Sequence, residues 1–189
     1  MQLISFQSGL SALVALMLSS SLILAGCASL AQPERERVGL KLAPATLGQS
    51  LSLQQHLTIE RNGRIDELDA ALDVDNARLE LVGLAFGQRV LTLRYEGKEL
   101  TEWRHKMLPS QVQAEDVLED LQLTLWPVDA IAQALPAGWR IIDQGLLRTL
   151  YREQQVVATI HYSEATRWSG TAVLDNLRYR YRLTIQAAP

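Results

Sequence analysis

The stretch LELVGLAFGQRVLTLRYEGKEL, residues 79–100, decides the fold of this chain. Its first part, residues 79–95, reads as two strands that meet at a tip loosened by Gly83 and Gly87. Glu96-Gly97 then turns the chain toward a further strand near Leu100. Successive strands joined by tight turns pair antiparallel, so the stretch predicts a run of hairpins.

A first hairpin precedes this stretch. Asn62-Gly63 is the strongest short hairpin signal in the chain, because both residues tolerate the positive φ of a type I′ turn. Apolar and polar residues alternate on both sides of it, over 51–59 and 67–75. After Gly138 the pattern predicts further strands at 139–151, 155–163, 170–175 and 177–185.

Two helices interrupt the strands. Ser110 and Gln113 have the spacing of a capping box that opens a helix. Its apolar face is made by Val117, Leu118, Leu121 and Leu125. Pro127 ends this helix and suits the first turn of the next, which Pro136 terminates. The sequence therefore predicts a mainly antiparallel β protein with inserted helices, an α+β fold.

The beginning of the chain carries an export signal. Residues 10–26 are apolar or small, and the first charged residue is Glu34. Leu24-Ala25-Gly26-Cys27 resembles the lipobox of bacterial lipoprotein signal peptides. The resemblance implies a signal peptide at 1–26, an acylated Cys27 with a tether over 27–45, and a single folded domain at 46–189. The other reading is an uncleaved helix with a buried, inert cysteine.

The residues after Cys27 indicate where the protein is anchored. In lipoproteins of this kind an aspartate after the cysteine retains the protein in the inner membrane, and here Ala28 and Ser29 follow instead. We therefore expect a lipid anchor in the outer membrane, facing the periplasm. The chain has no second cysteine, so its fold must be stabilised by its own core. A net charge of −3 gives no reason to expect a nucleic-acid partner.

The sequence contains none of the common catalytic motifs considered below. There is no nucleophile elbow and no phosphate-binding loop. His56, His105 and His161 are isolated from one another, and the acidic run over 66–75 fails the calcium-loop pattern. We expect a protein that is not an enzyme and that uses no cofactor and no metal.

Residues 79–100 resemble the central hairpin of the LolB family of outer-membrane lipoprotein receptors. The helical segment 117–136 occupies the position of that family's lid helices, and 181–185 matches its closing strand. The resemblance implies a monomeric, LolA/LolB-like unclosed β-barrel, capped by two helices, that holds acyl chains on its concave side. Residues 119–141 also resemble a family of uncharacterised lipoproteins associated with aryl-polyene gene clusters.

The apolar residues of these strands and helices are the candidate acyl-binding residues. They are Leu51, Leu53, Leu57, Ile59, Leu68, Leu72, Leu81, Leu91, Leu93, Leu121, Leu125 and Trp126. The alternative is that they pack as an ordinary core. The expected function is to bind acyl chains, or a lipoprotein or polyene lipid handed over by a periplasmic LolA-like carrier. The other candidate is a non-catalytic scaffold lipoprotein of an envelope or biosynthetic complex.

Two surface features lie outside this list. Leu84 and Phe86 stand between two glycines at a hairpin tip, where polar residues are usual, and the LolB resemblance implies a membrane-inserting loop. The alternative is that the tip folds back and buries Phe86. Arg178, Arg180 and Arg182 are expected on one face of the last strand, either as a solvated or ion-paired face or as a docking strip for anionic groups.

We expect Cys27→Ser to abolish lipidation and to leave an uncleaved precursor, because a hydroxyl is a far poorer nucleophile than a thiolate. Palmitate labelling with cell fractionation measures both effects. A serine variant that is labelled and membrane-bound would contradict the assignment of Cys27.

Overall fold

The computed structural model describes residues 37–188, which belong to one compact unit with its own core. The signal peptide expected at 1–26 and the candidate lipidation site Cys27 lie outside the described residues. Within the described residues no helix is long and apolar enough to span a membrane.

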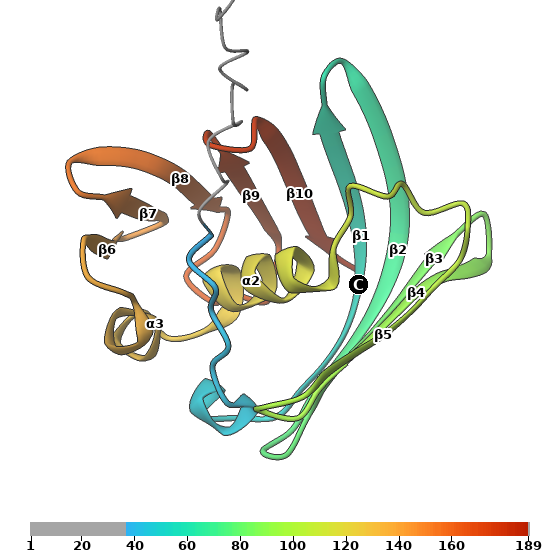
Figure 1. The fold of residues 1–189 in the computed structure, drawn as a ribbon, viewed down its shortest axis with the longest axis horizontal. Helices are drawn as coiled ribbons and strands as arrows, with labels where there is room; N and C mark the ends of the chain where they lie inside the picture. Colours follow the sequence, from blue (N-terminus) through green and yellow to red (C-terminus); the bar gives the residue numbers. More distant parts are fainter. Residues whose placement is uncertain (1–36, 189) are drawn as a thin grey trace, which may run out of the picture. The chain divides into compact units, whose positions relative to one another are not determined.

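Within residues 37–188 the strands join one antiparallel sheet of ten strands, in the order β5-β4-β3-β2-β1-β10-β9-β8-β7-β6 (Figure 1). The strands are β1 Leu51–Arg61, β2 Arg64–Val74, β3 Leu79–Ala85, β4 Gln88–Tyr95, β5 Leu100–Arg104, β6 Trp139–Gln144, β7 Leu147–Arg152, β8 Gln155–Tyr162, β9 Thr171–Asn176 and β10 Tyr181–Ala187. The first and last strands of this order do not pair with each other, so the sheet is open.

Two helices separate β5 from β6, as the sequence predicts. They are α2 Ala114–Leu125 and α3 Val128–Ala134, and a short 3-10 helix, η1 Pro44–Leu47, precedes β1. The sheet curves around α2 (Figure 1). The prediction of a mainly antiparallel sheet with two inserted helices is confirmed.

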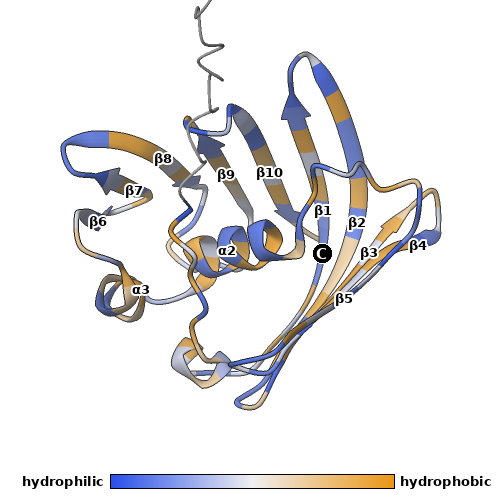
Figure 2. Cartoon of the chain, viewed as in Figure 1, coloured by the Kyte–Doolittle hydropathy of each residue, from blue (hydrophilic) through white to orange (hydrophobic). Residues whose placement is uncertain are grey.

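The turns of the first two hairpins follow from local backbone chemistry. Asn62 and Gly63 have φ of 53° and 76°, which confirms the turn predicted there. Phe86 and Gly87 form the turn between β3 and β4, with φ of 52° and 71°. Figure 2 shows the alternation of apolar and polar residues along β1 and β2 that places their apolar residues on one face.

Three predicted element boundaries are wrong. The capping box does not form, because α2 begins at Ala114 and Gln113 Nε2 instead donates to the Ser110 main-chain oxygen at 2.6 Å. The strand expected at 139–151 is the β6–β7 hairpin, since Gly145, with φ of 63°, turns the chain. Residues 177–180 form the turn between β9 and β10 rather than the start of the last strand.

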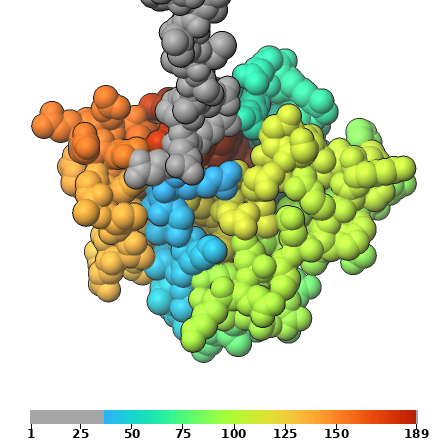
Figure 3. All heavy atoms as spheres, in the orientation of Figure 1, coloured from blue at the N-terminus to red at the C-terminus, as the bar shows by residue number. Residues whose placement is uncertain are grey.

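The segment before η1 covers the inner face together with α2. Val38, Leu40 and Leu42 alternate with exposed residues and are buried, so residues expected in the tether are part of the core. The fully buried Gln122 donates to the Leu42 main-chain oxygen at 2.9 Å and accepts from the Leu42 amide at 3.0 Å. In Figure 3 this segment, in blue, crosses the face that holds α2.

A buried arginine holds the carboxyl end of α2. Arg148 of β7 is 2% exposed, and its Nη1 donates to the main-chain oxygens of Leu123 and Trp126 at 2.6 and 3.0 Å. These carbonyls have no partner within the helix, so Arg148 satisfies them. Its other nitrogens donate to both carboxylate oxygens of Asp143 at 2.7 and 2.9 Å.

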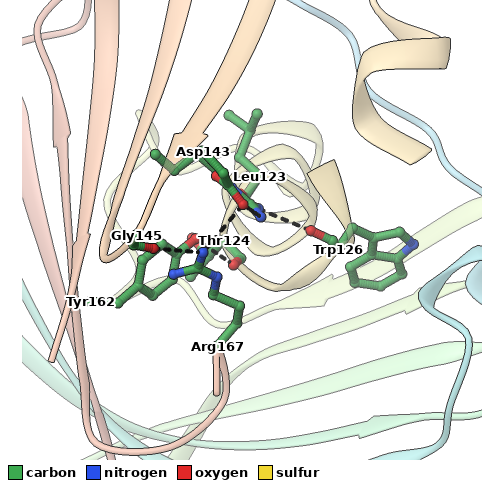
Figure 4. A network of polar contacts seen from close by, with 8 residues as sticks. Leu123, Thr124, Trp126, Asp143, Gly145, Tyr162 and Arg167 are labelled. Atoms are coloured by element: carbon green, nitrogen blue, oxygen red, sulfur yellow. Dashed lines mark hydrogen bonds and ion pairs between the residues drawn. The ribbon is translucent and has the colours of Figure 1, made fainter. Parts of the chain in front are cut away.

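Two further side chains complete this network, which Figure 4 shows. Tyr162 donates its hydroxyl to the Thr124 main-chain oxygen at 2.7 Å, and Arg167 donates to Asp143 at 3.2 Å. Burial opposes the ionisation of Asp143, but the two arginines outweigh it and hold the pKa of Asp143 below its usual value. The network therefore fixes α2 to β6, β7 and β8.

We expect Arg148→Met to lower the free energy of unfolding by about 3 kcal/mol or more, because it leaves two buried carbonyls without a donor and leaves Asp143 with Arg167 as its remaining arginine partner. The matched control is Arg182→Met, which removes an ion pair whose arginine is 50% exposed and should cost under about 1 kcal/mol. Urea unfolding of both variants measures the difference. Equal losses would contradict the role of Arg148.

Candidate functional site

Exposed apolar side chains gather around one groove, of about 570 Å³. Ile65, Phe86 and Met107, which are 61%, 95% and 53% exposed, all line it. The rest of the lining comes from the β2 segment 64–69, the β3–β4 tip at 84–86, the loop at 107–109, and His56 and Val90. The β2 segment adds charged side chains at one border of the groove: Arg64, Asp66, Glu67 and Asp69. We call this the apolar groove.

A step in the sheet creates the apolar groove. β3 pairs with β2 only over 69–74, so residues 64–68 of β2 extend past the β3–β4 tip with no strand beside that edge among the described residues. The loop after β5 is held near the step, because the His105 amide donates to the Val90 oxygen at 2.9 Å and Arg104 donates to the Pro109 oxygen at 2.9 Å.

The hairpin tip presents Phe86 to solvent. Phe86 occupies a turn position with positive φ, which costs a non-glycine residue about 1–2 kcal/mol. Its 95% exposure makes the alternative that it is buried in the core wrong. Leu84 does not belong to the turn: it is half-buried in β3, opposite Asp69 on β2 and Arg89 on β4.

Gly83 permits close packing beside the tip. The pairing of β3 with β4 shifts between Gly83 and Leu84. A Cβ at Gly83 would lie 3.1 Å from Leu68 Cδ1, closer than side chains usually approach. The absent side chain therefore leaves room for Leu68, which lines the apolar groove.

The candidate acyl-binding residues divide into two groups. Seven are buried in the core: Leu72, Leu81, Leu91, Leu93, Leu121, Leu125 and Trp126. Trp126 is fully buried and its Nε1 donates to Thr46 Oγ1 at 3.0 Å. The other five are half-buried residues of β1 and β2: Leu51, Leu53, Leu57, Ile59 and Leu68. Of the twelve, only Leu68 lines the apolar groove.

The arginine strip expected on the last strand does not form. Arg178 and Arg180 lie in the β9–β10 turn, where Arg180 has φ of 57°. Only Arg182 is in β10, and its Nε donates to Asp175 Oδ1 on β9 at 2.7 Å. Asp175 raises the pKa of Arg182, so for this residue the ion-paired alternative is confirmed.

An aspartate of α2 faces the sheet. Tyr181 of β10 donates its hydroxyl to Asp120 Oδ2 at 2.6 Å, and Asn176 donates to the same hydroxyl at 3.2 Å. Burial raises the pKa of Asp120 to about 7. Glu119 beside it is also buried, which raises its pKa, and accepts the Gly39 amide at 2.8 Å. Across residues 37–188 no three acidic, histidine or cysteine side chains are placed to hold a metal ion.

Fold and groove together define an α+β protein with an open antiparallel sheet, a helix on its inner face and a groove lined by exposed apolar side chains. The chain belongs to the family described as "Protein of unknown function (DUF3261)", whose model matches residues 52–189. This confirms the expected membership of an uncharacterised domain family. No curated protein matches the chain.

Asp120 should make stability depend on pH. Between its ordinary pKa of 3.8 and about 7, the folded chain retains a proton that the unfolded chain loses. The free energy of unfolding therefore falls as pH rises through this window and levels off above it. Asp120→Asn removes this contribution, so the wild-type melting temperature minus that of the variant should fall across the window.

Thermal melts between about pH 4 and pH 8 measure this difference. The control is Ser52→Ala at an exposed position of β1, which changes no titratable group and should give a difference that does not change with pH. A constant difference for Asp120→Asn as well would contradict the proton assignment.

Proposed function

We propose that this protein is a lipid-anchored, non-catalytic carrier or receptor that binds an acyl chain in the apolar groove. The observation that carries the proposal is the gathering of Ile65, Phe86 and Met107 around one groove. Exposed apolar side chains that stand singly need no explanation, whereas a contiguous patch marks a binding or membrane-contact surface.

The energetics of an acyl ligand suit this groove. Its volume of about 570 Å³ falls within the range of small-molecule sites. Burying each methylene group of an acyl chain gains about 0.8 kcal/mol. Phe86 lies in the turn between β3 and β4, and Met107 lies in the loop after β5. The methionine side chain adapts its shape to irregular apolar partners.

The cellular setting that fits the proposal is the periplasmic face of the outer membrane. Cys27 would hold the protein there through its acyl chains, and the exposed Phe86 would contact the bilayer or the cargo. We propose a LolA/LolB-like relationship, in which a periplasmic carrier hands over a lipoprotein or a lipidated polyene product. The open sheet with a helix on its inner face supports this relationship.

Native mass spectrometry of residues 28–189 tests the proposal. Without Cys27, any acyl species that co-purifies is a bound ligand rather than the anchor. Fatty acyl adducts on the purified protein support the carrier. A protein that stays empty, including after incubation with palmitate, contradicts it and favours the scaffold function.

We expect Phe86→Glu to reduce transfer of an acyl ligand to liposomes while leaving the free energy of unfolding within about 0.5 kcal/mol, since Phe86 is 95% exposed. The control is Leu146→Glu, which places the same charge at an exposed leucine of the β6–β7 turn, away from the apolar groove. A liposome transfer assay and thermal melts give both readouts. Equal transfer by the two variants would remove the role of Phe86.

A further inference from the structure

A second groove adjoins the apolar groove. It has a volume of about 500 Å³ and lies between the β1–β2 hairpin, residues 60–65, and the β9–β10 hairpin, residues 175–182. Arg64 and Ile65 line both grooves. The two grooves therefore meet at the tip of the β1–β2 hairpin. We call the second one the cationic groove.

Arginines outnumber carboxylates in the cationic groove. Its lining contains Arg61, Arg64, Arg180 and Arg182 against Glu60 and Asp175. Asp175 pairs with Arg182 at 2.7 Å, and Asp66 pairs with Arg64 at 2.8 Å.

Two of these arginines remain uncompensated. Within residues 37–188 the side chains of Arg61 and Arg180 make no ion pair and no hydrogen bond. Each therefore offers a guanidinium group whose donors are available to a ligand.

The strand register places Arg61 on the inner face of the sheet. Arg61 lies opposite Tyr181 of β10, whose hydroxyl contacts Asp120 of α2, so both side chains are on the face that α2 covers. On the other side Arg61 lies directly opposite Arg64 of β2. Like charges directly opposite each other across two strands destabilise the pair. Asp66 offsets the charge of Arg64, and a bound anion would offset that of Arg61.

The same face becomes apolar a short way from these arginines. The row next to Arg61 and Arg64 places Ile59 opposite Asp66, and the row after it places Leu57 opposite Leu68. Farther along the face Leu53 lies opposite Leu72. Leu53, Leu57 and Leu68 are only half-buried, so α2 does not cover this part of the face completely. Leu68 lies on this face and also lines the apolar groove, so the apolar groove adjoins the face that carries Arg61. An apolar groove beside unpaired arginines matches a ligand with an apolar chain and an anionic end.

We infer that the cationic groove binds the anionic head group of the lipid whose chain lies in the apolar groove. This inference rests on the proposed function and names its ligand class, an acyl-chain amphiphile with a terminal carboxylate or phosphate. Arg61 and Arg180 supply the planar donor pairs that both anions accept, with Arg64 beside them. The ligand spans the tip of the β1–β2 hairpin, where the two grooves meet.

Competition binding on residues 28–189 tests the inference, with a fluorescent fatty acid as the reporter. The competitors share one chain length: palmitate, hexadecyl phosphate and the uncharged hexadecanol. We expect both anionic competitors to bind about tenfold tighter than hexadecanol, the size of one charged hydrogen bond. Arg61→Gln and Arg180→Gln should each reduce this preference, and it should weaken as salt concentration rises.

The control variant is Arg94→Gln, which removes an exposed arginine that lines neither groove and pairs with Glu96. It should keep the full preference for the anionic competitors. Acetate and inorganic phosphate should not displace the reporter, since they have no chain.

The results that would contradict the inference can be told apart from those that would contradict the proposed function. Equal binding of palmitate and hexadecanol by the wild type, or a preference that survives both arginine substitutions, overturns the head-group site and leaves the acyl-binding function standing. Displacement by inorganic phosphate indicates a free-anion site and also overturns the inference. Failure of every chain-bearing competitor to bind overturns the proposed function together with the inference.

Discussion

The fold depends on how an open sheet covers its inner face. The described strands form one sheet in which β1 pairs with β10 and the two edge strands, β5 and β6, do not meet. The inward side chains must therefore pack on something other than an opposite sheet. α2 provides that surface, together with the segment that Gln122 binds through Leu42. A helix placed this deeply has carbonyl groups at its end that water cannot reach, and Arg148 satisfies two of them. The arginine is in turn neutralised by Asp143, which makes the network sensitive to the loss of either partner.

The coverage by α2 is uneven, and the candidate site lies where it ends. Leu72 of β2, Leu93 of β4 and Leu174 of β9 have no exposed surface. Leu68, nearer the β1–β2 turn on β2, and Leu57 opposite it on β1 are half-buried. From residue 68 toward the β1–β2 turn, β2 extends past the end of β3, and the apolar groove lies at this step in the sheet. The groove thus arises from a mismatch in strand length, beside a core whose helix is fixed by buried polar contacts.

Local signals in the sequence were enough to predict the β1–β2 and β3–β4 hairpins. Asn62-Gly63 and the 79–95 stretch combine alternation with turn residues that suit positive φ, so the structure agrees with them. The turn between β9 and β10 could not be predicted, because the alternation of apolar and polar residues continues unbroken through Arg180. The residue that indicates this turn is Asn176, whose Oδ1 accepts a hydrogen bond from the Tyr179 amide at 2.9 Å.

Long-range geometry could not be predicted in this way. Alternation says which leucines face inward, but whether α2 covers them depends on contacts such as Arg148 with Leu123, which are distant in sequence. No sequence motif marks Ile65 or Met107 as part of a site. They line one groove with Phe86 because β3 pairs with only part of β2.

The most direct measurement on the apolar groove is methyl NMR with stearate that carries a nitroxide near the end of its chain. A chain lying in the groove brings the nitroxide close to Ile65, Leu68 and Met107, so their methyl signals should broaden selectively. The methyl signals of the fully buried Leu118 and Leu174 should keep their width. Broadening that avoids the groove residues, or that affects core and groove methyl groups alike, would contradict acyl binding at this site.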